Sequence, residues 1–586
     1  MSCDKLVYDL SQEVEGSPNV FIRKDWINIL DNQNQNYQNN QSIVDTSQLA
    51  NSNKYMSYRE AYLAVPMLLS YRTPQAAGGV NITPNDFSIG LKNWFGSIIH
   101  SMTLDYNGTT IVQQTPFCNM WNSFKLLTTL SWGDISTMGP TIGFYPDTSD
   151  AWVYWTAAAN TIEGVGISNN SCGGYISAAS QNLSNNRYNQ AVPAAGAPTI
   201  GGNVGLTYRT KWIAYDPTAN AGTASYGTNF VSAAFSAQLW KSNVSRRVAS
   251  AGNGTTGILQ ISVMATIYLK HLHSFFNMCP LLKGVFMKLT FNLNNSTCTV
   301  ANSAAVQPTL GCTASTSFVG GIQPIMVPSS YTGGLLTNIP AASNAYYDLV
   351  VGSRCYNNDI LNPPAGSPAA AEGNVSKSVY LYVPAYTFNP TFEQAYLSNN
   401  IKQIKYTDIY QYQFDFESGQ AGFNQLITNG IANIKSVLII PFYKVPMATG
   451  GASVVQFQSP FDPAGAGTCA PMASITNFNI QISGQNAIYN MQRYTFEEWN
   501  NQLYGQNAVN GGLTDGLTSG LLDFNDFQHS YSYYYVNVER MLPVEQSVPK
   551  SVQVIGQNLG TLPIRAYVFI EYGVSVAIDV LTGARV

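Results

Sequence analysis

The sequence contains, near its end, the stretch YYYVNVERMLPVEQSVPKSVQVIGQNLGTLPIRAYVFIEYGVSVAIDV (533–580), in which apolar-rich runs are separated by Pro and Gly. The last run alternates with a period of two residues, and the positions that share one face of an extended chain are Val574, Val576, Ile578 and Val580. The runs at 531–540, 550–558 and 564–580 are therefore predicted to be three β-strands.

The same alternation occurs through much of the chain. It is found at 98–106, 260–269 and 285–293, and it begins again near residue 401. The segment KHLHSFFNMCPLLKG (270–284) is too short and too broken for a long helix, and it predicts a corner with one helical turn. Residues 146–255 are rich in Gly, Ala, Ser and Asn, and they predict long loops with a few short strands.

The two halves of the chain share an order of features: a strand, a tight turn, a second strand, a helix start and a Trp-Asn pair. In the first half the turn, the N-cap and the pair are at Asn107-Gly108, Thr115-Pro116 and Trp121-Asn122. In the second half the turn, the capping box and the pair are at Ser483-Gly484, Thr495 to Glu498 and Trp499-Asn500. This order predicts a repeated fold, and chance recurrence in a large β protein is the alternative.

Two antiparallel β modules, each with a short capped helix in a loop, predict jelly-roll sandwiches. The predicted fold class is all-β: two tandem antiparallel jelly-roll β-sandwiches with short loop helices and long inserted loops. The tract NQNQNYQNNQ (32–41) has no apolar face to bury, so residues 1–54 are predicted to form an N-terminal arm. We predict the first jelly roll at 55–398, with its long loops near 146–255, and the second at 399–586.

Charged residues are scarce. Only 28 Lys and Arg and 32 Asp and Glu occur among 586 residues, which is 10 % where about 25 % is usual for a soluble domain. Subunit interfaces are depleted in charge and rich in aromatic residues, so the composition fits a protein covered by copies of itself; a large solitary β protein with long loops is the alternative. The net charge of -4, without basic blocks, argues against nucleic-acid binding.

No apolar run reaches the length of about 18 residues that a membrane span needs. The first residues, MSCDKLVYDL, lack the basic and then apolar order of a signal peptide. Synthesis in the cytosol is therefore expected, and in that compartment the cysteines are expected to be free, mostly buried thiols.

The sequence gives poor support to an enzyme or a metal site, and we predict no catalytic, cofactor-binding or metal-binding residues. The pair His271-x-His273 has a spacing known from metal sites, but no Glu follows closely, so a structural pair at a corner is favoured. Glu497 and Glu498 are adjacent on a predicted helix and point apart, which disfavours a glycosidase pair. Gly450-Gly451 lacks the Lys-Ser/Thr of a phosphate loop, so it predicts an ordinary turn.

Two further groups have a functional and a structural interpretation. The residues Tyr531, Tyr533 and Tyr535 share one face and could stack on sugars or bases, but packing inside a sandwich or a subunit contact is favoured. Asp147 and Asp150 could hold Ca²⁺ with loop carbonyls, but a solvated turn is favoured.

The stretch from 533 to the end resembles the C-terminal part of major capsid proteins of virophages and polinton-like viruses, in the wider lineage of the adenovirus hexon. The positions that fit that pattern are Arg540, Lys550, Ser551, Gly556, Asn558 and Thr582-Gly583. The segment VYLYVPAYTFNPTFEQAYL (379–397) is similar to the junction between the two jelly rolls of that family, and 265–293 is similar to the end of its first jelly roll.

This resemblance implies a double jelly-roll major capsid protein that forms pseudo-hexagonal homotrimers in an icosahedral shell around a double-stranded DNA genome. Its partners would be further copies of itself, neighbouring capsomers, and penton and minor capsid proteins, and it would be located in the virion. The arm would thread under neighbouring capsomers, and the long loops would form an outward tower. A virion spike or a carbohydrate-binding β-sandwich protein is the alternative function.

Overall fold

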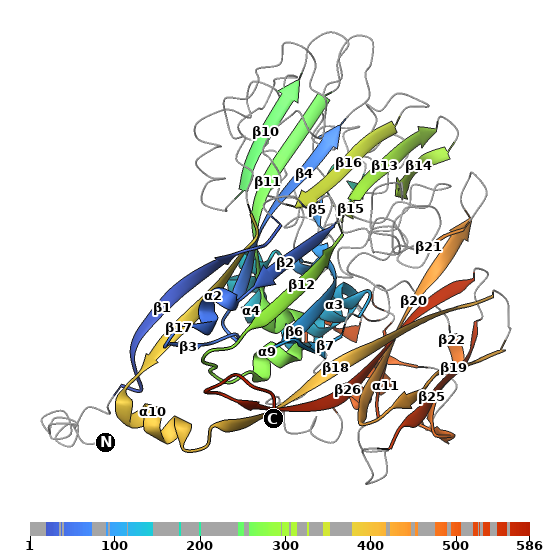
Figure 1. Ribbon diagram of the computed structural model, residues 1–586. Coiled ribbons are helices and arrows are strands. Elements are labelled where there is room, and N and C mark those ends of the chain that lie inside the picture. The colour runs from blue at the N-terminus through green and yellow to red at the C-terminus, as the bar shows by residue number, and fades with distance from the viewer. Residues whose placement is uncertain are drawn as a thin grey trace, which may run out of the picture.

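The computed structural model describes residues 19–33, 37, 40–72, 90–91, 94–113, 115–144, 175–176, 199–200, 244–250, 257–294, 296–303, 306–312, 325–326, 344–351, 378–417, 422–446, 452–454, 475–488, 494–504, 520–524, 527, 531, 533–538, 548–558 and 563–586. Within these residues the chain forms two antiparallel β-sandwiches that lie side by side (Figure 1). The predicted Ca²⁺ or turn residues Asp147 and Asp150, the Gly450-Gly451 turn and most of the loop region 146–255 lie outside the described residues.

The first sandwich has one large sheet and one small sheet. The large sheet has the strand path β1 (Phe21–Leu30), β17 (Tyr380–Phe388), β4 (Tyr62–Arg72), β16 (Asn344–Val351), β13 (Ser296–Ser303) and β14 (Val306–Cys312). On the other side of β4 it continues with β11 (Gly257–Tyr268) and β10 (Val244–Ser250), and β3 (Tyr55–Met56) pairs with β17. The small sheet has the order β2 (Gln41–Asp45), β12 (Met287–Leu293), β6 (Ile99–Tyr106) and β7 (Thr109–Val112).

The second sandwich has the sheets that follow residue 400. One has the order β18 (Ile401–Phe416), β26 (Ile564–Asp579), β20 (Ile434–Pro446) and β21 (Ala452–Val454), with β24 (Tyr534–Asn537) also paired to β20. The other has the order β19 (Gly422–Ile431), β25 (Lys550–Asn558), β22 (Ile475–Ile482) and β23 (Gln485–Asn486). Two small pairs elsewhere are β5 (Gly90–Leu91) with β15 (Ile325–Met326), and β8 (Tyr175–Ile176) with β9 (Thr199–Ile200).

The helices are short and lie in the connections. They are α2 (Ser47–Ala50), the 3₁₀ helix η2 (Phe95–Ile98), α3 (Cys118–Thr129), α4 (Trp132–Ile142), α8 (Leu269–Leu272), α9 (Ser274–Met278), α10 (Pro390–Leu397) and α11 (Phe496–Tyr504). The corner predicted at 270–284 is formed by α8 and α9. Of the two matched helices, α3 follows the β6–β7 hairpin and α11 follows the β22–β23 hairpin, so they have equivalent places in the two sandwiches.

Both sandwiches have the same strand order. Numbered along the chain as eight main strands each, their first sheets pair strands 1-8-3-6, as β1-β17-β4-β11 and β18-β26-β20-β24. Their second sheets pair strands 2-7-4-5, as β2-β12-β6-β7 and β19-β25-β22-β23. This is the eight-stranded jelly-roll arrangement, in which two sheets pack face to face. The chain is a double jelly roll, which confirms the fold class predicted from the sequence.

The hairpin turns repeat as well. Asn107 and Gly108 have φ values of 45° and 80°, and Ser483 and Gly484 have φ values of 51° and 83°. Positive φ at both central residues gives a turn whose twist matches the twist of the flanking strands. The predicted tight turns are confirmed in both halves.

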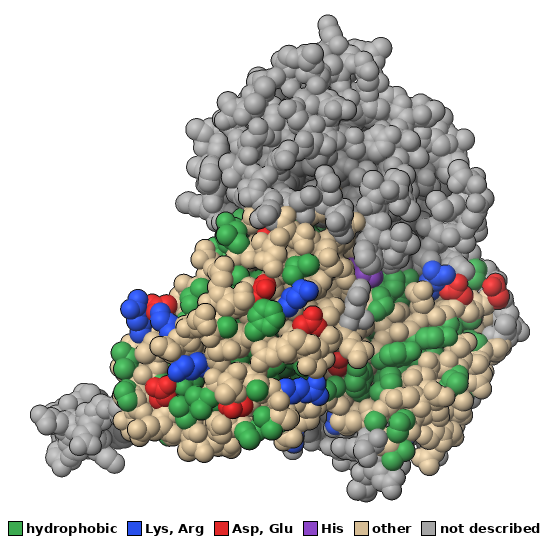
Figure 2. All heavy atoms as spheres, in the orientation of Figure 1, with side chains coloured by type: hydrophobic (Ala, Val, Ile, Leu, Met, Phe, Trp, Pro, Cys, Tyr) green, Lys and Arg blue, Asp and Glu red, His purple; other side chains and the backbone are tan. Residues whose placement is uncertain are grey.

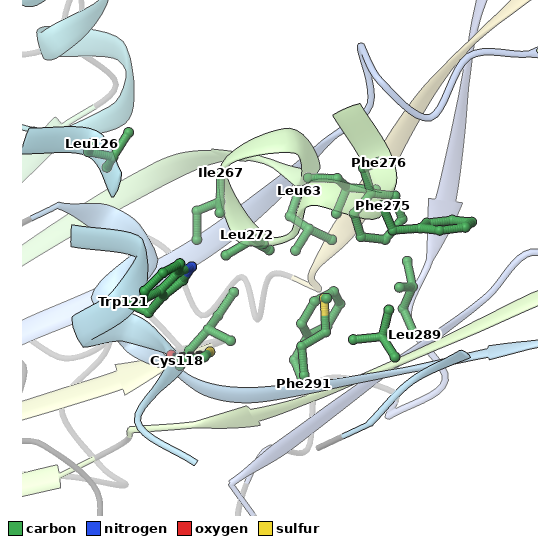
Figure 3. Close-up of a cluster of buried hydrophobic side chains, with 14 of the residues drawn as sticks. Leu63, Cys118, Trp121, Leu126, Ile267, Leu272, Phe275, Phe276, Leu289 and Phe291 are labelled. Atoms are coloured by element: carbon green, nitrogen blue, oxygen red, sulfur yellow. Dashed lines mark hydrogen bonds between the residues drawn. The ribbon is translucent and has the colours of Figure 1, made fainter. Parts of the chain in front are cut away.

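The buried core contains the apolar residues of the segments in which apolar and polar residues alternate. In β12 every second residue from Met287 to Leu293 is buried, and the residues between them are half-buried. Figure 3 shows how Leu289 and Phe291 face Leu272 and Phe276 from the corner helices, with Trp121 of α3 alongside. Packing of these faces supplies the main free energy of folding, at about 25 cal/mol per Å² of apolar surface removed from water.

Part of the predicted N-terminal arm belongs instead to the first sandwich. β1 pairs with β17 in the register Trp26↔Pro384, and β2 pairs with β12 in the register Val44↔Leu289. Inside the polar tract, Tyr37 is buried and its hydroxyl accepts a hydrogen bond from the Val379 amide at 2.8 Å. The prediction of an arm is wrong for these segments because β1 and β2 are paired with β17 and β12, and Ile29 and Val44 are buried.

The predicted helix starts differ in accuracy. The expected N-cap at Thr115 is wrong, because α3 begins after Phe117, which has a φ of 57°, and the Thr115 hydroxyl donates to the Ile409 carbonyl at 2.9 Å. In α11 the Thr495 hydroxyl accepts from the Glu498 amide at 3.4 Å, as predicted. The Glu498 carboxylate accepts from Gln502 at 2.8 Å.

Candidate assembly surfaces

The central strands β26 and β20 are buried on both faces over part of their length. Along β26 the residues Ala566 to Ile570 are all buried; Val568 and Ile570 belong to the core of the second sandwich. Tyr567 and Phe569 point the other way and belong to a core that is continuous with the first sandwich. The two jelly rolls are therefore joined by an apolar interface.

This interface was not predicted, although the sequence carries a signal for it. The runs AYVFI (566–570) and VLIIPF (437–442) are continuously apolar, which is typical of strands that are covered on both faces. The alternation from 574 to 580, at the end of β26 and just beyond it, matches the part of the chain that has only one buried face.

Aromatic side chains from α3 form the centre of the interface. Trp121 lies 6.2 Å from Phe569, and Phe124 lies 6.0 Å from Trp499 and 5.6 Å from Tyr535, measured between ring centroids. The two Trp residues of the repeated order thus contribute to the same contact from opposite sides. Edge-to-face and offset ring pairs of this kind add about 0.5–1.5 kcal/mol each beyond their buried area.

The tyrosine group near 531 is part of this packing. Tyr531, Tyr533 and Tyr535 are at most 4 % exposed. Tyr533 stacks on Trp499 with ring centroids 6.1 Å apart and an interplanar angle of 25°. Because these rings are covered within the chain, the structural interpretation of the group is confirmed and a stacking platform for sugars or bases is excluded.

Polar contacts flank the aromatic centre at the corner helices. The His273 ring accepts a hydrogen bond at Nδ1 from the Phe275 amide at 3.2 Å, so Nε2 carries the proton and faces Asp408 Oδ1 at 3.3 Å. Ser274 donates to the Thr407 carbonyl at 2.5 Å. His273 is therefore a structural residue that joins the first sandwich to β18, as the sequence favoured.

The second histidine of the pair has different surroundings. His271 lies in α8, edge-on to Trp94 and Tyr268, with ring centroids 6.0 and 5.7 Å away. His271 and His273 do not converge on one point with a carboxylate. Among the residues that the structure describes, no group of three or more His, Cys, Asp or Glu is placed to hold a metal ion.

Burial strongly affects the titration of two histidines. It lowers the pKa of His100 to about 4, and burial followed by the charge of Lys270 lowers the pKa of His271 to about 4, from an ordinary value of 6.5. Burial also raises the pKa of the Cys118 thiol to about 12. Cys118 and Cys279 are free and buried, as predicted for these residues, and burial makes thiols inert.

Acidification from pH 6.5 to 4.5 is expected to destabilise the protein through these histidines. In that window the unfolded chain binds protons at His100 and His271 while the folded chain does not, so stability falls as the pH falls. Each histidine contributes at most about 1.4 kcal/mol per pH unit. Urea unfolding at several pH values would measure how the free energy of unfolding changes with pH. The variant His271→Phe keeps an aromatic ring beside Trp94, and it is expected to reduce this slope by about 1.4 kcal/mol per pH unit, the effect of one proton. An unchanged slope in the variant would contradict the assignment.

An outward apolar face lies on the first sandwich. Every second residue of β1 points to the same face of the strand, and on the outward face Ile22, Trp26 and Leu30 are 65 %, 51 % and 51 % exposed. The ring of Trp26 lies 5.7 Å from Tyr62 of β4, and Tyr62 stacks on Tyr382 of β17 at 5.1 Å. We call this set, Ile22, Trp26, Leu30, Tyr62 and Tyr382, the β1 face. Figure 2 shows hydrophobic side chains at the surface on the side where β1 lies in Figure 1.

Charged side chains accompany the β1 face: Lys24 lies in the same row of β1, between Ile22 and Trp26, and Asp25 lies in the opposite row. Lys24 pairs with Glu60 at 2.5 Å, and Lys54 pairs with Asp25 at 2.5 Å. Lys24 also lies 5.3 Å from the ring centroid of Trp26. Hydrogen bonds from Lys54 and then Arg23 lower the pKa of Asp25.

The chain has structural similarity to solved viral capsid proteins. The mavirus major capsid protein has a TM-score of 0.43 at 9 % identity, with 98 % of this chain and 92 % of that chain covered. The Faustovirus major capsid protein has a TM-score of 0.39 at 9 % identity, covering 98 % and 94 %. PBCV-1 VP54, as fitted into a reconstruction of the virophage Sputnik, has a TM-score of 0.35 at 8 % identity, covering 96 % of each chain.

The mavirus and Faustovirus structures are of major capsid proteins. At these identities and scores the similarity concerns only the general fold. No family profile and no curated protein matches the chain. Within the described part of the chain, no helix is both long enough and apolar enough to cross a membrane.

Proposed function

We propose that this protein is a major capsid protein whose homotrimers form pseudo-hexagonal capsomers of an icosahedral double-stranded DNA virus. It would be a virion component, synthesised in the host cytosol, with neighbouring capsomers and penton and minor capsid proteins as partners. The proposal assigns it no catalytic activity and no cofactor. We place the division between the two jelly rolls near residues 398–399, after α10.

The repeated topology carries the proposal. Three copies of a chain with two equivalent jelly rolls supply six similar modules around one axis, which is the symmetry that a pseudo-hexagonal tile requires. The apolar interface between the jelly rolls would make each chain a rigid pair, so that the six modules could keep fixed positions.

Two surface properties agree with permanent assembly. The chain has 10 % charged residues, and the β1 face offers an apolar, aromatic surface of the kind enriched in subunit contacts. An obligate trimer contact buries about 2,000 Å² or more, whereas contacts between capsomers are expected in the weaker class below about 1,200 Å².

The mass of the purified protein in solution tests the proposal. Light scattering coupled to gel filtration is expected to give about three times the chain mass of 63.7 kDa, independent of dilution over the micromolar range. A monomer at micromolar concentration would overturn the trimer.

A carbohydrate-binding or spike protein is the second candidate, because the β1 face carries exposed aromatic rings. Sugar rings stack on such surfaces through the same faces that pack in interfaces. A monomeric protein whose Trp fluorescence changes on titration with oligosaccharides would favour this candidate over the capsid function.

A further inference from the structure

The C-terminal residues fold back on the end of β26 as a tight turn. The Asp579 carboxylate accepts from the Leu581 amide and from the Thr582 hydroxyl, both at 2.9 Å. The Gly583 amide donates to the Asp579 carbonyl at 2.8 Å. The Leu581 amide is the main cause that lowers the pKa of Asp579. The turn is thus held by its own bonds and by a charged carboxylate.

This turn lies against the first jelly roll. The Lys283 amide donates to the Val580 carbonyl at 3.2 Å. The side-chain amide of Asn107 donates to the Gly583 carbonyl, and the Asn107 side-chain carbonyl accepts from the Phe286 amide at 3.2 Å. Val580 is fully buried. The second jelly roll is therefore attached to the β6–β7 turn and to the segment before β12 by directed bonds.

Glycine is required at the centre of the contact. Gly583 has a φ of +68°, and a Cβ atom there would lie 3.1 Å from Val285 Cγ2 and 3.2 Å from the Gly284 carbonyl oxygen. A Cβ atom there requires the turn or its neighbours to shift by a few tenths of an ångström, and the Gly284 oxygen belongs to backbone. The Thr582-Gly583 pair noted in the sequence is thus explained by a contact between the two jelly rolls.

We propose that residues 579–584 are a clasp that fixes the angle between the two jelly rolls. Asn107 is the residue of the first jelly roll whose side chain binds the clasp. The aromatic interface around Phe124 resists separation, but apolar contact is not directional. The hydrogen bonds of Asn107 and Lys283 have a required direction, as do those of Thr115 and Ser274 to β18. The clasp adds a directed contact at the far end of the chain, against Lys283 and the β6–β7 turn, so that together these bonds select one orientation. This inference concerns the chain itself and does not depend on the capsid function.

Two variants test the clasp. Asn107→Asp keeps a residue that tolerates positive φ, and it keeps an acceptor for the Phe286 amide. It replaces the donor to the Gly583 carbonyl by a carboxylate oxygen that repels it. Gly583→Ala adds the Cβ atom that meets Val285. Its matched control is Gly484→Ala, where φ is +83° and no atom lies within 4 Å of the added Cβ. The control carries the same backbone strain without the contact.

Hydrogen exchange of the Lys283 amide is the measurement, because its acceptor is Val580 across the contact. Both variants are expected to increase the exchange rate of this amide by up to about tenfold, because loss of one hydrogen bond shifts the local opening equilibrium by about that factor. The Gly573 amide, which donates to Asn433 inside the second jelly roll, is expected to be unaffected. Unchanged exchange at Lys283 in both variants, or the same increase in Gly484→Ala, would overturn the clasp. If Asn107→Asp does not fold, the comparison of the two glycine variants decides alone.

Discussion

Replacement of Phe124 by Ala is expected to lower the free energy of unfolding by about 3–5 kcal/mol, the usual cost of truncating a buried Phe. Phe124 is fully buried and lies on α3 of the first jelly roll. Its ring contacts Trp499, Tyr533 and Tyr535, all from the second jelly roll. The cavity would therefore open between the jelly rolls rather than inside either of them.

The location of the cavity gives this prediction a specific signature. We expect one thermal transition in the natural protein and two in Phe124→Ala, because the variant loses an aromatic contact that couples the jelly rolls. Phe291→Ala is the matched control: Phe291 is 1 % exposed and lies in β12 inside the first jelly roll, so it should cost similar stability without separating the transitions. Calorimetry measures both. Two transitions in the control, or one in Phe124→Ala, would contradict a coupling role for α3.

The sequence predicted those parts of the fold that depend on local patterns. The alternation in 285–293 predicted β12, and the apolar-rich run at 550–558 predicted β25. The pairs Asn107-Gly108 and Ser483-Gly484 predicted the hairpin turns. Period and turn chemistry are properties of a few adjacent residues, so they can be recognised without knowledge of distant partners. The equivalent helices after these hairpins confirm that the shared order reflects a repeated fold.

The sequence did not predict features that depend on distant partners. The strand β1 looked like part of an arm because its partner β17 lies far along the chain, in the register Trp26↔Pro384. The helix start at Thr115 failed because the hydroxyl of that residue bonds to Ile409 of the other jelly roll. The interface between the jelly rolls was missed, although its continuous apolar runs are visible at 437–442 and 566–570.

Substitution of the β1 face is expected to abolish the proposed trimer. Trp26 and Leu30 are each 51 % exposed in the chain, and a buried Trp at the centre of an interface contributes about 2 kcal/mol or more. In Trp26→Asp/Leu30→Asp the interface would have to desolvate two carboxylates, and it would no longer bury the two apolar side chains. Association should therefore weaken by about a thousandfold or more, at 1.4 kcal/mol per factor of ten.

The matched control for this variant is Trp132→Asp. Trp132 is 45 % exposed on α4, which is not one of the elements of the β1 face. The control therefore substitutes the same residue type at similar exposure. Light scattering at micromolar concentration should give a monomer for the double variant and a trimer for the control. Circular dichroism should be the same for both, since Trp26 and Leu30 point away from the core. A trimer in the folded double variant would exclude the β1 face as the contact while leaving the capsid proposal intact, whereas a monomer in the natural protein would remove both.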